Sequence, residues 1–106
     1  MPVLNQGFVG VQRCTTAAGE AVGTSGKPTR VYHIAILSGA AAGEVKLYNG
    51  ISTSGTIYVQ EKCTVVSTTN DFDYGQEGFL FPSGCYYEEV NDANVTSTLV
   101  TFSQEA

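Results

Sequence analysis

Short apolar runs alternate along this chain with turn-forming clusters, and this pattern sets the expected fold. Stretches rich in Val, Ile, Thr, Tyr and Phe are separated by Gly, Ser, Asn and Pro about every eight to twelve residues, which is typical of an all-β sandwich or barrel. No segment keeps apolar residues at the spacing of an amphipathic helix. The runs predicted as strands cover residues 7–14, 20–22, 30–37, 44–48, 56–66, 72–74, 78–81, 85–90 and 94–102.

From these runs we expect an antiparallel β-sandwich of about eight strands, either a jelly roll or an immunoglobulin-like fold. Residues 30–37 form the strongest predicted strand. Strict alternation places Tyr32, Ile34 and Ile36 on one face, and the other face then carries Val31, His33, Ala35 and Leu37. Both faces are largely apolar, so this strand is predicted to be central and covered on both sides.

The length of the chain predicts one domain over residues 1–106, with residues 1–7 as a candidate N-terminal arm. A chain of this size buries only about two-thirds of the surface that its unfolded form exposes. The stability of an isolated copy is therefore expected to be modest, and association with other copies is a natural way to raise it.

The composition favours a protein that packs against other proteins. Hydrophobic residues make up 42% of the chain but charged residues only 14%, against about 25% in an average soluble domain. Interface centres tend to exclude charges, so a charge-poor surface suits assembly. The net charge of −5 argues against nucleic acid as a partner, because that binding needs Lys and Arg to neutralise phosphates.

No stretch approaches the length of a membrane-spanning segment, and the first seven residues lack the basic start and apolar run of a signal peptide. We therefore expect no membrane partner and synthesis in the cytosol. The three cysteines, Cys14, Cys63 and Cys85, fit neither a disulfide framework nor a Cys-x-x-Cys motif. We interpret them as reduced, partly buried thiols.

Residues for catalysis are sparse. His33 is the single histidine, and its place in an apolar strand favours a side chain satisfied by a polar neighbour or lying in an interface. The carboxylates Asp71, Asp73 and Glu77 match a calcium loop only at its first two acids, so a solvated acidic loop is the better interpretation. We expect no enzymatic activity, no metal and no cofactor.

The candidate interface residues are apolar or aromatic. An apolar cluster beside the start of the chain has little reason to exist unless a partner covers it, which selects Pro2, Val3, Leu4 and Phe8. Tyr86 and Tyr87 are neighbours on a predicted strand and must point to opposite faces. One of these two tyrosines is therefore expected to face outward as an interface anchor.

Four segments stand out between Arg30 and Phe102: VYHIAILS at 31–38, GEVKLYNGISTSGT at 43–56, GFLFPSGCYY at 78–87 and VTSTLVTF at 95–102. Together they resemble small β-sandwich structural proteins of tailed-bacteriophage virions, particularly capsid decoration or cement proteins. The first 29 residues lie outside this resemblance. It implies a homo-oligomer, often a trimer, bound to the major capsid protein of a virion that assembles in the host bacterial cytoplasm.

Two alternatives remain open at the level of sequence. The same fold would serve a neck or tail adaptor, or a fibre-base protein, of the same kind of particle. The eleven aromatic residues, six Tyr and five Phe, also allow a carbohydrate-binding module for host attachment, because aromatic ring faces bind the faces of sugar rings. None of these functions requires catalytic residues.

Overall fold

The structure, a computed structural model, describes residues 8–16, 19–39, 41, 43–63, 68–90 and 94–104. It contains nine strands: β1 (Phe8–Cys14), β2 (Glu20–Val22), β3 (Thr29–Ser38), β4 (Gly43–Asn49), β5 (Thr56–Cys63), β6 (Thr69–Asp73), β7 (Phe79–Phe81), β8 (Cys85–Val90) and β9 (Val95–Gln104). All of the pairings between them are antiparallel. The predicted all-β sandwich is confirmed.

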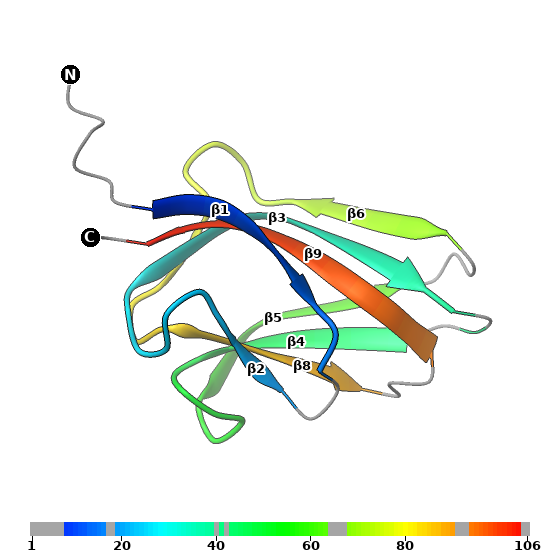
Figure 1. The fold of residues 1–106 in the computed structure, drawn as a ribbon, viewed down its shortest axis with the longest axis horizontal. Helices are drawn as coiled ribbons and strands as arrows, with labels where there is room; N and C mark the ends of the chain where they lie inside the picture. The colour runs from blue at the N-terminus through cyan, green and yellow to red at the C-terminus, as the bar shows by residue number, and fades with distance from the viewer. Residues whose placement is uncertain are drawn as a thin grey trace.

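The strands form two sheets that lie face to face (Figure 1). The five-stranded sheet has the order β1-β9-β3-β6, with β7 also paired to β3, and the four-stranded sheet has the order β2-β8-β4-β5. Strand β6 pairs with residues 33–37 of β3 and β7 with residues 29–31. The two short strands therefore share one position along a single edge of β3, which reconciles nine strands with the expected eight.

The strand order is that of a jelly roll. The first half of the chain pairs in reverse order with the second half: β1 with β9, β2 with β8, β3 with β6 and β7, and β4 with β5. Successive pairs lie in opposite sheets, so the chain forms one long antiparallel hairpin wrapped around a core, which is how a jelly roll is built. This order decides between the two predicted topologies, because an immunoglobulin-like fold does not pair its strands in this way.

Alternate residues of the two sheets fill the space between them. Strand β4 buries Val45 and Leu47 while Glu44 and Lys46 face outward, and β8 buries Cys85 and Tyr87 in the same manner. The largest fully buried side chains come from both sheets and include Tyr87, Phe81, Ile34, Ile36 and Leu47. The core is therefore continuous and lies between the sheets.

A β-bulge at Tyr32 changes the predicted faces of β3. Val31 pairs with Phe102 on β9 and His33 pairs with the preceding residue, so Tyr32 is an extra residue without a partner there. The bulge turns Val31 into the core with Ile34 and Ile36, and all three are fully buried. The predicted grouping of Tyr32 with Ile34 and Ile36, and of Val31 with the opposite face, is therefore wrong, because one inserted residue reverses the alternation.

Glutamine side chains fasten one long edge of the sandwich. Gln12 of β1 donates to the Ala21 carbonyl of β2 at 2.9 Å and accepts from the Gly23 amide at 2.8 Å. Gln104 of β9 accepts from the Thr24 amide at 2.9 Å and donates to the carbonyl of the same residue. Both side chains link the five-stranded sheet to the segment that contains β2, so side-chain hydrogen bonds join the two sheets along this edge.

Candidate functional site

The structure separates the predicted interface residues. Pro2, Val3 and Leu4 lie outside the described residues, so their prediction stays untested. Phe8 is the first residue of β1 and lies opposite Gln104 of β9, but its side chain is not among those described.

The prediction of Tyr87 as an interface residue is wrong, because its side chain is fully buried in the core. Tyr86, one position earlier, faces the opposite way and is half-buried. Its ring packs over Gly19, where a Cβ atom would come within 2.4 Å of the Tyr86 ring. Tyr86 is therefore the outward-facing member of the pair, on the outer side of the four-stranded sheet.

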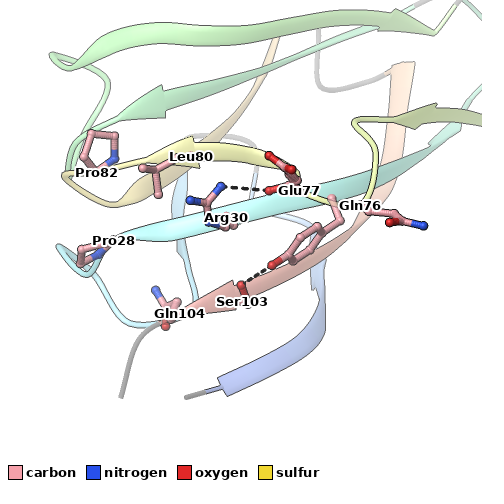
Figure 2. Close-up of a pocket in the computed structure, with 9 residues that line it drawn as sticks. Pro28, Arg30, Gln76, Glu77, Leu80, Pro82, Ser103 and Gln104 are labelled. Carbon is pink, nitrogen blue, oxygen red and sulfur yellow. Dashed lines mark hydrogen bonds between the residues drawn. The ribbon is translucent and has the colours of Figure 1, made fainter. Parts of the chain in front are cut away.

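A groove of about 520 Å³ lies on the outer side of the five-stranded sheet, over the first half of β3 (Figure 2). Arg30 and Tyr32 of β3 lie between two walls. One wall comes from β7 and the loop before it, and the other from the end of β9. The residues that line the groove are Pro28, Arg30, Tyr32, Gln76, Glu77, Leu80, Pro82, Ser103 and Gln104.

Two hydrogen bonds fix the shape of this groove. Arg30 Nη1 donates to the Glu77 carbonyl at 3.0 Å, which ties β3 to the loop before β7 (Figure 2). The Tyr32 hydroxyl and Ser103 Oγ lie 2.7 Å apart across β3 and β9. The lining as described holds charged and amide groups and one aromatic ring, but no His or Cys. Such a lining is able to hydrogen-bond a polar ligand.

Exposed apolar side chains lie on β5, on β7 and in the loop between β4 and β5. We call this surface the apolar edge, and it consists of Ile51, Ile57, Tyr58, Phe79 and Leu80, which are between 38% and 65% exposed. Tyr58 is an extra residue in β5, because Leu47 pairs with Val59 and Tyr48 with Ile57. Its ring reaches β7, with centroid distances of 5.8 Å to Phe79 and 5.4 Å to Phe81.

The sequence analysis did not select the apolar edge, although two signals point to it. Residues 57–59 and 79–81 are each three consecutive large apolar residues. A strand places neighbouring side chains on opposite faces, so such a run must leave at least one of them outside unless both faces are covered. Only β4 pairs with β5 and only β3 pairs with β7 among the described strands, so the exposed members lie at sheet edges.

Several carboxylates accept hydrogen bonds from tyrosines. Glu88 accepts from Tyr48 at 2.5 Å, Glu61 from Tyr74 at 2.8 Å and the buried Glu89 from Tyr87 at 2.6 Å. The bond to Glu88, aided by burial, raises the pKa of Tyr48 to about 12. Burial, followed by the neighbouring carboxylate, raises the pKa of Tyr74 and of Tyr87 still further. The bonds of Glu88 and Glu61 link separate segments of the chain, whereas Glu89 and its tyrosine lie on the same strand.

The predicted acidic cluster is dispersed. Asp73 Oδ1 accepts a hydrogen bond from the Gly75 amide at 2.8 Å, whereas Asp71 Oδ1 lies 3.2 Å from His33 Nε2. Glu77 lines the groove. Within the described ranges, no group of three or more His, Cys, Asp or Glu side chains is placed to hold a metal ion. His33 is satisfied by a polar neighbour, as the sequence predicted.

All three cysteines are free and buried. Burial raises the pKa of the Cys14 thiol to about 12, and the negative charge of Glu20 adds to the effect. Burial also raises the pKa of Cys85. Protonated, enclosed thiols are poor nucleophiles and poor metal ligands, so they act as small apolar residues of the core.

Comparison with family models, with curated proteins and with solved structures finds no match to this chain. The class that the strand order defines is a jelly roll, and this one has a polar groove on the outer side of one sheet. Among the described residues, no helix is long and apolar enough to span a membrane.

Proposed function

We propose that this chain is a structural subunit of a bacteriophage virion, a capsid decoration or cement protein that stabilises the head lattice. The apolar edge is the observation that carries the proposal. Five large apolar side chains lie exposed along β5, β7 and the loop after β4, on a chain in which only 14% of residues are charged. Exposed large apolar side chains of this kind favour a protein that binds other proteins.

The fold and the resemblance support the same reading. Jelly rolls occur in viral capsid domains and in lectins, although a fold alone does not fix a function. The sequence resemblance between Arg30 and Phe102 favours a subunit bound to the major capsid protein. It also favours a homo-oligomer, with a trimer as the preferred arrangement.

The mechanism follows from geometry and number. Each copy would bury the apolar edge against a neighbouring capsid protein and keep the charged outer side of β4 in water. One such contact is weak because the edge is small, but contacts repeated over a closed lattice act together. The lattice then resists expansion without any chemical step, and no residue of the chain needs to be catalytic.

The test compares particles that carry the wild-type chain with particles that carry the double variant Tyr58→Asp/Leu80→Asp. We expect the variant to fall off the particle and the heads to release DNA at a lower temperature, because two charges are placed at an apolar contact. Thr96→Asp is the matched control, since this exposed residue lies on β9 away from the apolar edge. Unchanged binding and heat resistance of the double variant would overturn the proposal.

Copy number separates a head protein from a neck, tail or fibre-base protein of the same particle. A lattice protein is present in hundreds of copies, whereas a neck or tail adaptor is present in about a dozen or fewer, as cyclic symmetry dictates. Quantitative gel densitometry against the major capsid protein gives this number directly. A count of a dozen would move the proposal from the head to the neck or tail.

The groove favours carbohydrate binding as a second candidate function. It combines the ring of Tyr32 with the charged or amide side chains of Arg30, Gln76 and Glu77, a set that suits the hydroxyls and the apolar face of a sugar. Titration with mono- and oligosaccharides up to millimolar concentration, followed by NMR chemical shifts, tests it. Shifts confined to the groove would support binding, and their absence across a glycan array would remove this candidate.

A further inference from the structure

The outer face of the five-stranded sheet is unusually apolar for a surface that nothing described covers. Val11 of β1 is 62% exposed, and Ala35, Leu37 and Leu99 are half-buried on the same face. Antiparallel sheets normally turn polar residues to the solvent side. The apolar outer side of β3, which the sequence predicts to be covered, is therefore still open in a single copy.

Beyond the groove, which contains Arg30 and Glu77, the charges on this face are separated by sign across the sheet. Arg13 is exposed on β1, one edge of the sheet, and its Nη1 donates to Ser97 Oγ at 2.9 Å. Asp71 and Asp73 are exposed on β6, the opposite edge. Between them, β9 and β3 contribute mainly uncharged residues. This part of the face thus has an uncharged centre, with Arg13 on one side and the two carboxylates on the other.

The strand register aligns these residues in straight rows across the sheet. Arg13 pairs with Leu99, Leu99 with Ala35, and Ala35 with Asp71. The neighbouring row runs through Val11, Thr101, His33 and Asp73. Each row crosses β1, β9, β3 and β6 in that order, so it is symmetric about the line between β9 and β3.

We propose that two copies of this chain pack together through this face, about a two-fold axis that runs along the strands between β9 and β3. The rotation lays β1 of one copy over β6 of the other. Arg13 then lies opposite Asp71 of the second copy, and Leu99 lies opposite Ala35, a large side chain against a small one. The pairing rests on the proposed function and names one surface through which copies associate, but it replaces the trimer that the resemblance favours with a two-fold pair.

A second copy fits this face because the face is complementary to itself. A two-fold interface brings the same patch together twice, so every attraction is made twice. Packed sheets lie about 10 Å apart, a gap that the long side chain of Arg13 is able to cross towards a carboxylate. Apolar residues then occupy the centre and charges the rim, which is the usual arrangement of a protein interface.

The test is charge exchange in the full-length chain. Sedimentation equilibrium and light scattering over about 10 to 500 µM, a range suited to a small interface, should give a monomer–dimer equilibrium. Arg13→Asp and Asp71→Arg should each weaken the dimer about tenfold or more, because each sets like charges opposite one another. The double variant Arg13→Asp/Asp71→Arg should restore dimerisation towards the wild-type level.

The rescue is diagnostic because Arg13 and Asp71 are three strand spacings, about 14 Å, apart within one copy and do not touch. Lys62→Asp, which makes the same charge change on the outer side of the four-stranded sheet, is the control and should leave the dimer unchanged. Circular dichroism confirms that each variant folds.

Three results would overturn the inference: a monomer at every concentration, a trimer mass, or a double variant as weak as the single variants. Any of them leaves the proposed function standing, because loss of particle stability in the Tyr58→Asp/Leu80→Asp variant is measured separately. Conversely, a dimer rescued by charge exchange would stand even if the chain proved to bind no particle.

Discussion

The Tyr87 hydroxyl donates a hydrogen bond to the Glu89 carboxylate at 2.6 Å inside the core, two residues further along the same face of β8. The hydroxyl also lies 2.9 Å from Thr98 Oγ1 on the opposite sheet. A buried carboxylate is tolerated only when donors surround it. The Tyr87 hydroxyl therefore satisfies the Glu89 carboxylate on its own strand and joins the two sheets through Thr98.

Replacement of Tyr87 by Phe should lower the free energy of unfolding by about 1 to 3 kcal/mol, because a buried carboxylate loses a donor. Urea denaturation followed by circular dichroism measures the loss. Tyr86→Phe is a close control: it is the same change one position earlier on the outward face, and it should cost less than about 0.5 kcal/mol. Equal losses in the two variants would show that the Glu89 contact adds nothing.

The stability of the fold should decline at alkaline pH, partly through Cys14. Burial raises the pKa of this thiol from 9.0 to about 12 in the folded protein. Below pH 9 the thiol is protonated in both the folded and the unfolded protein, so its contribution to the free energy of unfolding is intact. Between pH 9 and about 12 the thiol of the unfolded protein loses its proton first. Stability is therefore lost as the pH rises through this window.

The Cys14→Ala variant should show a flatter decline of unfolding free energy between pH 9 and 11 than the wild type, measured by urea denaturation. In the native protein at pH 8, a thiol reagent such as dithionitrobenzoate should leave Cys14 and Cys85 unmodified until denaturant is added. Rapid native modification, or identical pH slopes for the two proteins, would contradict the burial of this thiol.

The strands could be predicted from the sequence because alternation and turn residues are local signals. That pattern predicted where the eight or nine strands lie, that they pair antiparallel, and that β3 is central. The bulge at Tyr32 could not be predicted, since an extra residue in a strand is set by the register of its partner β9. The bulge places Val31 in the core and Tyr32 in the groove, between its two walls.

The candidate site was harder to predict because exposure depends on which strands lie at sheet edges. Tyr58 and Phe79 resemble core residues in sequence, and only the edge positions of β5 and β7 leave them partly exposed. Tyr87 shows the converse, since alternation could say that Tyr86 and Tyr87 face opposite ways but not which of them faces the second sheet. The packing of the two sheets decides which of the two tyrosines is buried.

Gly78 should be irreplaceable beside the bulge. Its φ is +70°, and a Cβ atom there would lie 2.8 Å from Tyr32 Cδ1 and 2.9 Å from the Val31 carbonyl oxygen. Gly75 has a similar φ of +85°, but a Cβ atom there would meet nothing within 4 Å. A comparison of alanine substitutions at the two glycines therefore separates the cost of backbone strain from the cost of steric conflict.

We expect Gly75→Ala to cost about 1 to 2 kcal/mol of unfolding free energy, which is the penalty of a left-handed backbone for alanine. Gly78→Ala should cost at least about 2 kcal/mol more, because the Val31 carbonyl is backbone and cannot swing aside. Urea denaturation of both variants measures the difference, and NMR shifts of the Tyr32 ring should change only in Gly78→Ala. Similar costs for both would mean that the loop adapts and the contact is not tight.

Gln104 should contribute more to stability than its position near the end of the chain suggests. Besides its two bonds to the backbone of Thr24, its amide nitrogen donates to the Val22 carbonyl at 3.3 Å and to Thr29 Oγ1 at 2.9 Å. Its side chain is only 4% exposed, and Gln104→Ala removes a hydrogen-bonding partner from Val22, Thr24 and Thr29. The expected loss of unfolding free energy is about 2 to 4 kcal/mol, the sum of more than one unmade hydrogen bond.

Gln60→Ala, at an exposed glutamine on β5, is the control and should change stability by less than about 0.5 kcal/mol. Hydrogen exchange should also quicken at the Thr24 amide in Gln104→Ala, and unchanged protection there would argue that water replaces the glutamine and that this edge is not fastened by its side chain.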